Sequence, residues 1–144
     1  MIVENLSSAT SGRLMMIASH ASVATAARAL LDQNIGLLVV CGPEGEAVGV
    51  LSRVDLVRHI ADEQARESLA GLMSTDIVSC RPEDDLLGAW KVMTAQGLQS
   101  MPVLGIESRP VGVLDLRDAL KALFDAELYQ EQLLENYISG FGYN

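Results

Sequence analysis

The stretch VGVLSRVD, residues 48–55, ends a short apolar run at a serine and places an aspartate three residues later. A constant offset along the chain lays it on VGVLDLRD, residues 111–118. The identical pairs in this stretch are Val48/Val111, Gly49/Gly112, Val50/Val113, Leu51/Leu114 and Asp55/Asp118. Without a gap, the same offset aligns Ala26/Ala89, Gln33/Gln96, Val40/Val103, Gly42/Gly105 and Glu44/Glu107. A chain that matches itself at one constant offset contains an internal repeat.

Each repeat carries the same order of patterns. Apolar residues at helical spacing predict a first helix that stops at Asn34 or Gly97, residue types that accept the left-handed conformation. Two apolar runs around a polar turn then predict a strand hairpin: IGLLVVC and VGVL in the first repeat, LQSMPVL and VGVL in the second. The segments VDLVRHI and RDALKALF predict a second helix, and LMMIAS and, more clearly, DIVSC predict a leading strand.

The predicted fold is α+β, with two pseudo-symmetric β-α-β-β-α repeats. A unit of this size cannot bury its own sheet face, so we expect the repeats to pack sheet to sheet. The predicted organisation is an N-terminal segment (1–13), a first repeat (14–61), a linker (62–75), a second repeat (76–124) and a C-terminal helical extension (125–144).

The composition restricts the class of function. The 144 residues are 49% hydrophobic and only 4% aromatic, which predicts an aliphatic core. A formal net charge of −9 would repel nucleic acid and anionic membrane surfaces at long range. No apolar run approaches the roughly 20 residues of a membrane span, and the start lacks a signal-peptide pattern. We therefore expect a cytoplasmic protein with no nucleic-acid or membrane partner.

Chemistry-bearing residues are sparse. Cys41 and Cys80 are predicted to be small buried residues, because they lie far apart and no histidine stands near them at metal-ligand spacing. The acids of PEDDL, residues 82–86, suit a helix N-terminus. No nucleophile and base pair stands out, so the sequence predicts neither an enzyme nor a metal site.

In its repeat and in the order of its predicted elements, the chain resembles the tandem cystathionine-β-synthase (CBS) domain pair, or Bateman module. The resemblance spans roughly residues 14–124 and is carried by a strand, a helix, an apolar hairpin and the pattern G-h-h-[ST]-x-x-D, in this order twice. It implies a regulatory module rather than an enzyme, with no resident cofactor. Such modules commonly bind an adenosine-containing ligand (AMP, ADP, ATP or S-adenosylmethionine) in clefts between the halves, form disc-like homodimers, and can act on an effector protein.

The resemblance also implies roles for individual residues. Asp55 and Asp118 would bind the ribose hydroxyls and Ser52 the phosphate. The adenine base would lie against apolar strand residues: Ile77, Val78, Met101 and Pro102. The second repeat departs from the pattern at Asp115, which would repel a phosphate, and the first repeat has Val39 in place of Pro102. Arg53 and Arg117 lie inside the two motifs, where they would neutralise phosphates or serve as ordinary surface charges.

Two alternatives stay open. Ser52-x-x-Asp55 and Asp115-x-x-Asp118 also match a helix-capping arrangement, in which the first side chain caps the helix and the second carboxylate favours its positive end. Capping and ligand binding can coexist, because a helix N-terminus is itself an anion site. At the level of the whole protein, the alternative to a ligand sensor is a ligand-free dimerisation or docking module.

Overall fold

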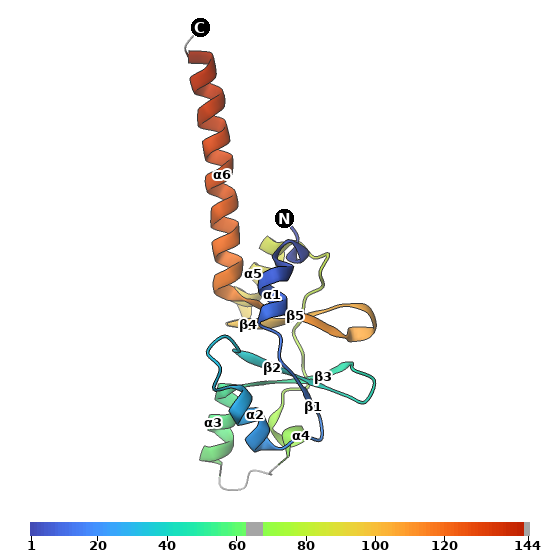
Figure 1. Ribbon diagram of the computed structural model, residues 1–144. Coiled ribbons are helices and arrows are strands. Elements are labelled where there is room, and N and C mark those ends of the chain that lie inside the picture. The colour runs from blue at the N-terminus through green and yellow to red at the C-terminus, as the bar shows by residue number, and fades with distance from the viewer. Residues whose placement is uncertain (63–67, 143–144) are drawn as a thin grey trace.

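The computed structural model describes residues 1–62 and 68–142 and contains both helices and strands. Two small sheets lie next to each other in the middle of the molecule (Figure 1). Each sheet is covered by helices on the side that faces away from the other sheet (Figure 1). The predicted α+β class with two sheets packed face to face is therefore confirmed.

The first repeat forms a three-stranded sheet in the order β1-β2-β3. Strands β1 (Met16–Ala18) and β2 (Leu37–Cys41) run parallel, and β2 pairs antiparallel with β3 (Ala47–Ser52). Helix α2 (Val23–Ala29) connects the two parallel strands, and α3 (Arg53–Ala61) follows directly on β3. The order is the predicted β-α-β-β-α.

The second repeat keeps the hairpin and helices but has a weaker leading strand. Strands β4 (Ser100–Leu104) and β5 (Pro110–Asp115) pair antiparallel around the short 3-10 helix η2 (Ile106–Ser108). The strand predicted at DIVSC, residues 76–80, is reduced to one parallel bridge between Cys80 and Val103. That bridge is the counterpart of the Ile17–Val40 pair in the first repeat, so the position of the strand is retained and its length is not.

The first helices of the repeats end differently. Helix α5 (Leu86–Gln96) ends as predicted at Gly97, which adopts a left-handed conformation with φ 67°. The predicted end of α2 at Asn34 is wrong, because the helix stops at Ala29. The guanidinium of Arg53 donates to the carbonyls of Leu30, Asp32 and Ile35 at 2.7–2.9 Å, which satisfies backbone acceptors beyond the shortened helix.

The segments that precede the repeats cross over to the opposite half. The N-terminal 3-10 helix η1 (Val3–Leu6) and α1 (Ser7–Gly12) pack on the second repeat, where Val3 is 1% exposed in the core. Helix α4 (Leu69–Leu72) packs on the first repeat through the buried Leu69. Each hydrophobic core is thus completed by residues that precede the other repeat.

The glycine shared by both VGVL stretches makes room for these crossings. A Cβ on Gly49 would lie 3.1 Å from the carbonyl oxygen of Ser74, whose backbone pairs with Val50 through two hydrogen bonds. A Cβ on Gly112 would lie 2.8 Å from the Cβ of Thr10 in α1. A side chain at either position would push away the segment that covers the strand.

The two sheets meet through an aliphatic layer. Leu37, Val39 and Val113 are buried there, with Leu14 and Val50 packed against them. The other two cores lie between each sheet and its own helices. The sheets are therefore buried on both faces, which places the ends of β3 and β5 beside the contact between the repeats.

The last helix differs from the prediction in its continuity. The predicted second helix of repeat two and the C-terminal extension form a single helix, α6 (Leu116–Gly142), about 40 Å long at 1.5 Å per residue. Its first turns pack on the second core through Ala119, and the rest projects away from the body of the molecule (Figure 1). Within residues 1–62 and 68–142, no helix combines enough length with enough apolar character to cross a bilayer.

Substituting Gly112→Ala should lower the free energy of unfolding by about 2 kcal/mol, because the new methyl group overpacks against Thr10. Urea unfolding of the purified protein measures this change. Gly12→Ala is the matched control, since its Cβ would meet nothing within 4 Å and its helical position should leave the stability unchanged or slightly raised. Equal stabilities for the two variants would contradict the crossing as a packing constraint.

Candidate ligand-binding cleft between the repeats

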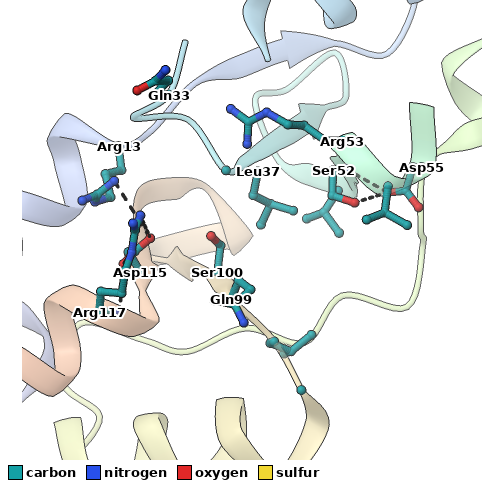
Figure 2. Close-up of a pocket in the computed structure, with 15 residues that line it drawn as sticks. Arg13, Gln33, Leu37, Ser52, Arg53, Asp55, Gln99, Ser100, Asp115 and Arg117 are labelled. Atoms are coloured by element: carbon teal, nitrogen blue, oxygen red, sulfur yellow. Dashed lines mark hydrogen bonds and ion pairs between the residues drawn. The ribbon is translucent and has the colours of Figure 1, made fainter. Parts of the chain in front are cut away.

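A cavity of about 550 Å³ lies between the two repeats, on the edge where β3 and β5 end. This volume falls within the range of small-molecule sites. Its lining combines polar side chains with a few aliphatic ones: Arg13, Gln33, Gly36, Leu37, Val50, Ser52, Arg53, Val54, Asp55, Gly97, Leu98, Gln99, Ser100, Asp115 and Arg117. Figure 2 shows Arg13, Asp115 and Arg117 gathered on one side and Ser52 and Asp55 on the other, with Leu37 and Ser100 between them.

The cavity brings together both repeated motifs. Ser52, Arg53 and Asp55 lie where β3 passes into α3, and Asp115 and Arg117 lie where β5 passes into α6. The two strand-to-helix turns lie far apart in sequence and face one space. The residues singled out by the sequence from these motifs therefore converge, with Asp118 joined to them through Arg13.

The residues expected to contact the base lie elsewhere. Met101 and Pro102 are buried in β4, and Val78 packs against the core of the second repeat. None of these three, nor Ile77, is among the residues lining the cavity. Met101 instead lines a separate cavity of about 340 Å³ at the start of α5.

The first motif forms the capping box that the sequence allowed. The backbone N–H of Ser52 donates to Oδ2 of Asp55 at 2.8 Å, and the Ser52 hydroxyl donates to the same oxygen at 3.1 Å. The other oxygen, Oδ1, lies 3.4 Å from Nη1 of Arg58, whose side chain is 73% exposed. Capping therefore uses Oδ2, while the partner of Oδ1 is an exposed surface cation.

Arg53 is held by the backbone of the first repeat. Its three hydrogen bonds to carbonyl oxygens connect the start of α3 to the loop between α2 and β2. Its charge still lies on the wall of the cavity, but these donors are engaged in shaping the fold.

The second motif is an ion cluster rather than an open cap. Asp115 accepts hydrogen bonds from the backbone N–H of Arg117 at 2.8 Å and from that of Asp118 at 3.3 Å, which caps α6. The side chain of Arg117 returns to Asp115 with two contacts of 3.3 Å. Arg13, from the N-terminal segment, holds both carboxylate oxygens of Asp118 through Nε and Nη2.

Burial and charge act in opposite directions on this cluster. Burial raises the pKa of Asp115, but hydrogen bonds from the side chain and backbone of Arg117 and the charge of Arg13 outweigh it, so the pKa lies below its ordinary value. The hydrogen bond to Asp118 raises the pKa of Arg13. The charged form of Asp115 is therefore favoured by the two guanidinium groups beside it.

Sequence reasoning missed Arg13 and several neutral polar groups. Arg13 precedes the residues at which the two repeats are identical and meets Asp118 across 105 residues of chain, so no local pattern points to it. Gln33, Gln99 and Ser100 also line the cavity. The offset between the repeats pairs Gly36 with Gln99 and Leu37 with Ser100, and all four residues line the cavity. A comparison of the two repeats at the start of their hairpins would therefore have pointed to these positions.

Neither cysteine lines the 550 Å³ cavity, although Cys80 lines the smaller one at the start of α5. Burial raises the pKa of the Cys80 thiol to about 12, and burial followed by the charge of Glu46 raises that of Cys41. Both thiols are free. Across the described ranges, no group of histidine, cysteine and acidic side chains has the arrangement needed to hold a metal ion.

Proteins of similar sequence match most of the chain. It is 21% identical over 118 residues to an uncharacterized 17.7 kDa protein of Acidianus ambivalens, covering 82% of this chain and 72% of that protein. It is 24% identical over 106 residues to the homoserine O-acetyltransferase of Methanococcoides burtonii, covering 74% of this chain. The match spans only about a fifth (21%) of that enzyme's length.

Solved structures share the fold at low sequence identity. The CBS domain pair of protein MJ0100, in complex with 5′-methylthioadenosine and S-adenosyl-L-methionine, superposes with a TM-score of 0.75 at 20% identity, covering 88% of this chain and 98% of that one. CBSX2 in complex with AMP gives a TM-score of 0.75 at 18% identity, with the same coverages. The CBS-domain containing protein ATU1752 of Agrobacterium tumefaciens gives 0.72 at 25% identity, covering 85% and 98%.

The sequence pattern, the fold and a family model agree. The model for the CBS domain matches the chain twice in succession, at residues 6–62 and 68–125. Together these matches cover more than half of the chain. The chain therefore belongs to the CBS domain family and is a tandem CBS domain pair.

Proposed function

We propose that this protein is a regulatory module that binds an adenosine-containing ligand in the cavity between its two repeats. The observation that carries the proposal is the convergence of both strand-to-helix turns on one cavity of about 550 Å³. A ligand held there touches both repeats at once. Its occupancy is then able to shift the balance between arrangements of the repeats that differ in affinity for it.

The charge of the cavity supports a ligand with an anionic part. The chain carries a formal net charge of −9, yet the cavity lining includes Arg13, Arg53 and Arg117 against Asp55 and Asp115. A carboxylate such as Asp55 accepts two hydrogen bonds from adjacent hydroxyls, and charged acceptors form stronger hydrogen bonds than neutral ones. Leu37 and Val50 provide apolar surface for a planar base.

The ligands of related folds point to the same chemical class. The MJ0100 pair is described with 5′-methylthioadenosine and S-adenosyl-L-methionine, and CBSX2 with AMP. These compounds share the adenosine unit and differ in charge. We extend to this chain only the adenosine unit, because the identities of 18–20% show the fold alone.

The cavity favours binding over catalysis. The residues that line it, as far as the structure describes them, include no histidine, cysteine or lysine. Its arginines are engaged with carboxylates or backbone carbonyls, which suits a pre-shaped binding wall. We therefore propose a regulatory rather than a catalytic role for this cavity.

We also propose that the module forms a homodimer through the outer faces of α3 and α6. Val57 and Leu120 occupy equivalent positions in the two repeats and are 64% and 53% exposed. Ile60 extends the apolar face along α3, and Phe124 extends it along α6. Equivalent apolar faces on both pseudo-symmetric halves suit a second copy related by a two-fold axis.

A ligand-free docking module remains the alternative function, and α6 is the observation that favours it. Leu128, Leu133, Leu134, Tyr137 and Ile138 are each 42–64% exposed on the projecting part of this helix. Exposed apolar residues gathered on one element are typical of interaction sites.

The ligand proposal predicts a thermal shift. At a concentration 100 times its Kd, a ligand that binds only the folded state adds about 2.7 kcal/mol, which raises Tm by several degrees. We expect this from at least one of AMP, ADP, ATP, S-adenosylmethionine and 5′-methylthioadenosine at millimolar concentration. Differential scanning fluorimetry provides the measurement.

The Asp55→Ala variant should lose the shift, because it removes the carboxylate proposed to bind the ribose. Asp85→Ala is the matched control: Asp85 also caps a helix, by accepting from the N–H of Gly88 at 2.9 Å, but does not line the cavity. Asp85→Ala should therefore keep the shift while lowering the starting Tm. Absence of any shift in the unmodified protein would refute the sensor and leave the docking alternative.

The dimer proposal predicts a change of mass. A double variant, Val57→Asp and Leu120→Asp, should convert the dimer to a monomer in light scattering, because buried carboxylates would face each other across the interface. Ile106→Asp is the control, since Ile106 is 80% exposed in η2 and lies on neither helix face. A monomeric unmodified protein, or a double variant that stays dimeric, would contradict this interface.

A further inference from the structure

We propose that Arg13 is a latch that closes the second half of the cleft, so that each chain binds one adenosine-containing molecule, on the Asp55 side. This inference rests on the proposed function. It assigns a specificity role to a residue outside both repeated motifs.

The contacts of Arg13 carry the proposal. Its guanidinium holds both oxygens of Asp118, and Nη1 lies 4.0 Å from Oδ2 of Asp115. Nη1 also donates to the backbone carbonyl of Asn34 at 3.2 Å. Arg13 therefore ties the second motif to the loop that leads into β2 of the first repeat, across the cavity edge. Planar two-pronged pairing of this kind is the strong form of an ion pair in proteins.

The two aspartates differ in what a ribose would have to displace. The two carboxylates are similarly buried, with side chains 23% (Asp118) and 18% (Asp55) exposed, so the difference lies in their partners. Arg13 is 22% exposed and bonds both oxygens of Asp118, whereas Arg58 is 73% exposed and makes one contact of 3.4 Å with Asp55. Hydroxyl groups that reach Asp55 displace a solvated cation, and the capping oxygen keeps its bonds. Hydroxyl groups that reach Asp118 must separate a shielded ion pair and leave Arg13 without its carboxylate partner.

In the described ranges, 1–62 and 68–142, the first repeat has no equivalent latch. The offset between the repeats places Arg13 on Asp76, an acidic residue that cannot pair with Asp55. The surroundings of Asp55 and Asp118 therefore differ for two reasons. The N-terminal segment supplies an arginine to Asp118, and the position of Ser52 is occupied by Asp115 in the second repeat. With Arg13 removed, the space beside Asp118 would open next to a second carboxylate, Asp115, and would accept a neutral adenosine compound more readily than a phosphorylated one.

The test is the number of molecules bound per chain, measured by isothermal titration calorimetry with 5′-methylthioadenosine. This probe is uncharged and keeps both ribose hydroxyls, so phosphate repulsion does not enter. We expect one molecule per chain for the unmodified protein and two for Arg13→Gln. Adding Asp118→Ala to Arg13→Gln should return the number to one, because the newly exposed acceptor is removed.

Arg81→Gln is the charge-matched control, since Arg81 pairs with Glu83 on the surface and does not line the cavity, and it should bind one molecule. Arg13→Lys covers the case in which the glutamine variant does not fold. It keeps the charge but not the two-pronged geometry, so a second, weaker molecule is expected.

The outcomes separate the two proposals. Two molecules on the unmodified protein, or one on both Arg13 variants, would overturn the latch while leaving the ligand-binding function intact. No heat of binding with 5′-methylthioadenosine, combined with no thermal shift from any adenosine compound, would overturn both.

Discussion

The structure depends on one packing constraint: each repeat needs a segment from outside itself to complete its core. The N-terminal helices bury Val3 in the second core, and α4 buries Leu69 in the first. The crossing segments run so close to the sheets that a side chain in place of Gly49 or Gly112 would have to push them away. Exchange of covering segments makes the two halves interdependent, so neither half is expected to fold as this structure does without the other.

This interdependence also creates the cleft. Because the sheets pack face to face with a pseudo-two-fold relation, the ends of β3 and β5 emerge on the same edge and both strand-to-helix turns face one cavity. The crossing of the N-terminal segment delivers Arg13 to that edge. A residue whose position follows from core completion thereby becomes part of the electrostatics of the site.

The near-symmetry of the fold makes its departures informative. Ser52 and Asp55 form a cap that keeps one carboxylate oxygen toward an exposed partner, whereas Asp115 and Asp118 are enclosed by Arg117 and Arg13. The same backbone turn thus presents a carboxylate paired with one exposed cation in one repeat and a neutralised cluster in the other. Two equivalent sequence positions do not imply two equivalent sites.

Residue types and their spacing along the chain were enough to predict most helices and strands. They were not enough where a residue distant in sequence changes the local structure. The end of α5 at Gly97 was predictable, because the left-handed turn depends only on that residue. The end of α2 was not, because Arg53 supplies donors to the carbonyls of Leu30, Asp32 and Ile35 from 18 to 23 positions away. The leading strand of the second repeat was overestimated because apolar content predicts burial there, while the extent of pairing depends on the neighbouring chain.

The sequence by itself determined the repeat, the β-α-β-β-α order, the aliphatic core and the two motifs that reach the cleft, since these depend on periodicity and on residue types read along the chain. Only the tertiary structure decided which segments cover which core and that Met101 is enclosed in the core rather than facing the cleft. It also decided that Arg13 lies against Asp118. The physical reason is that covering segments and ion pairs are selected by proximity in space, and contacts across 105 residues leave no periodic trace in a single chain.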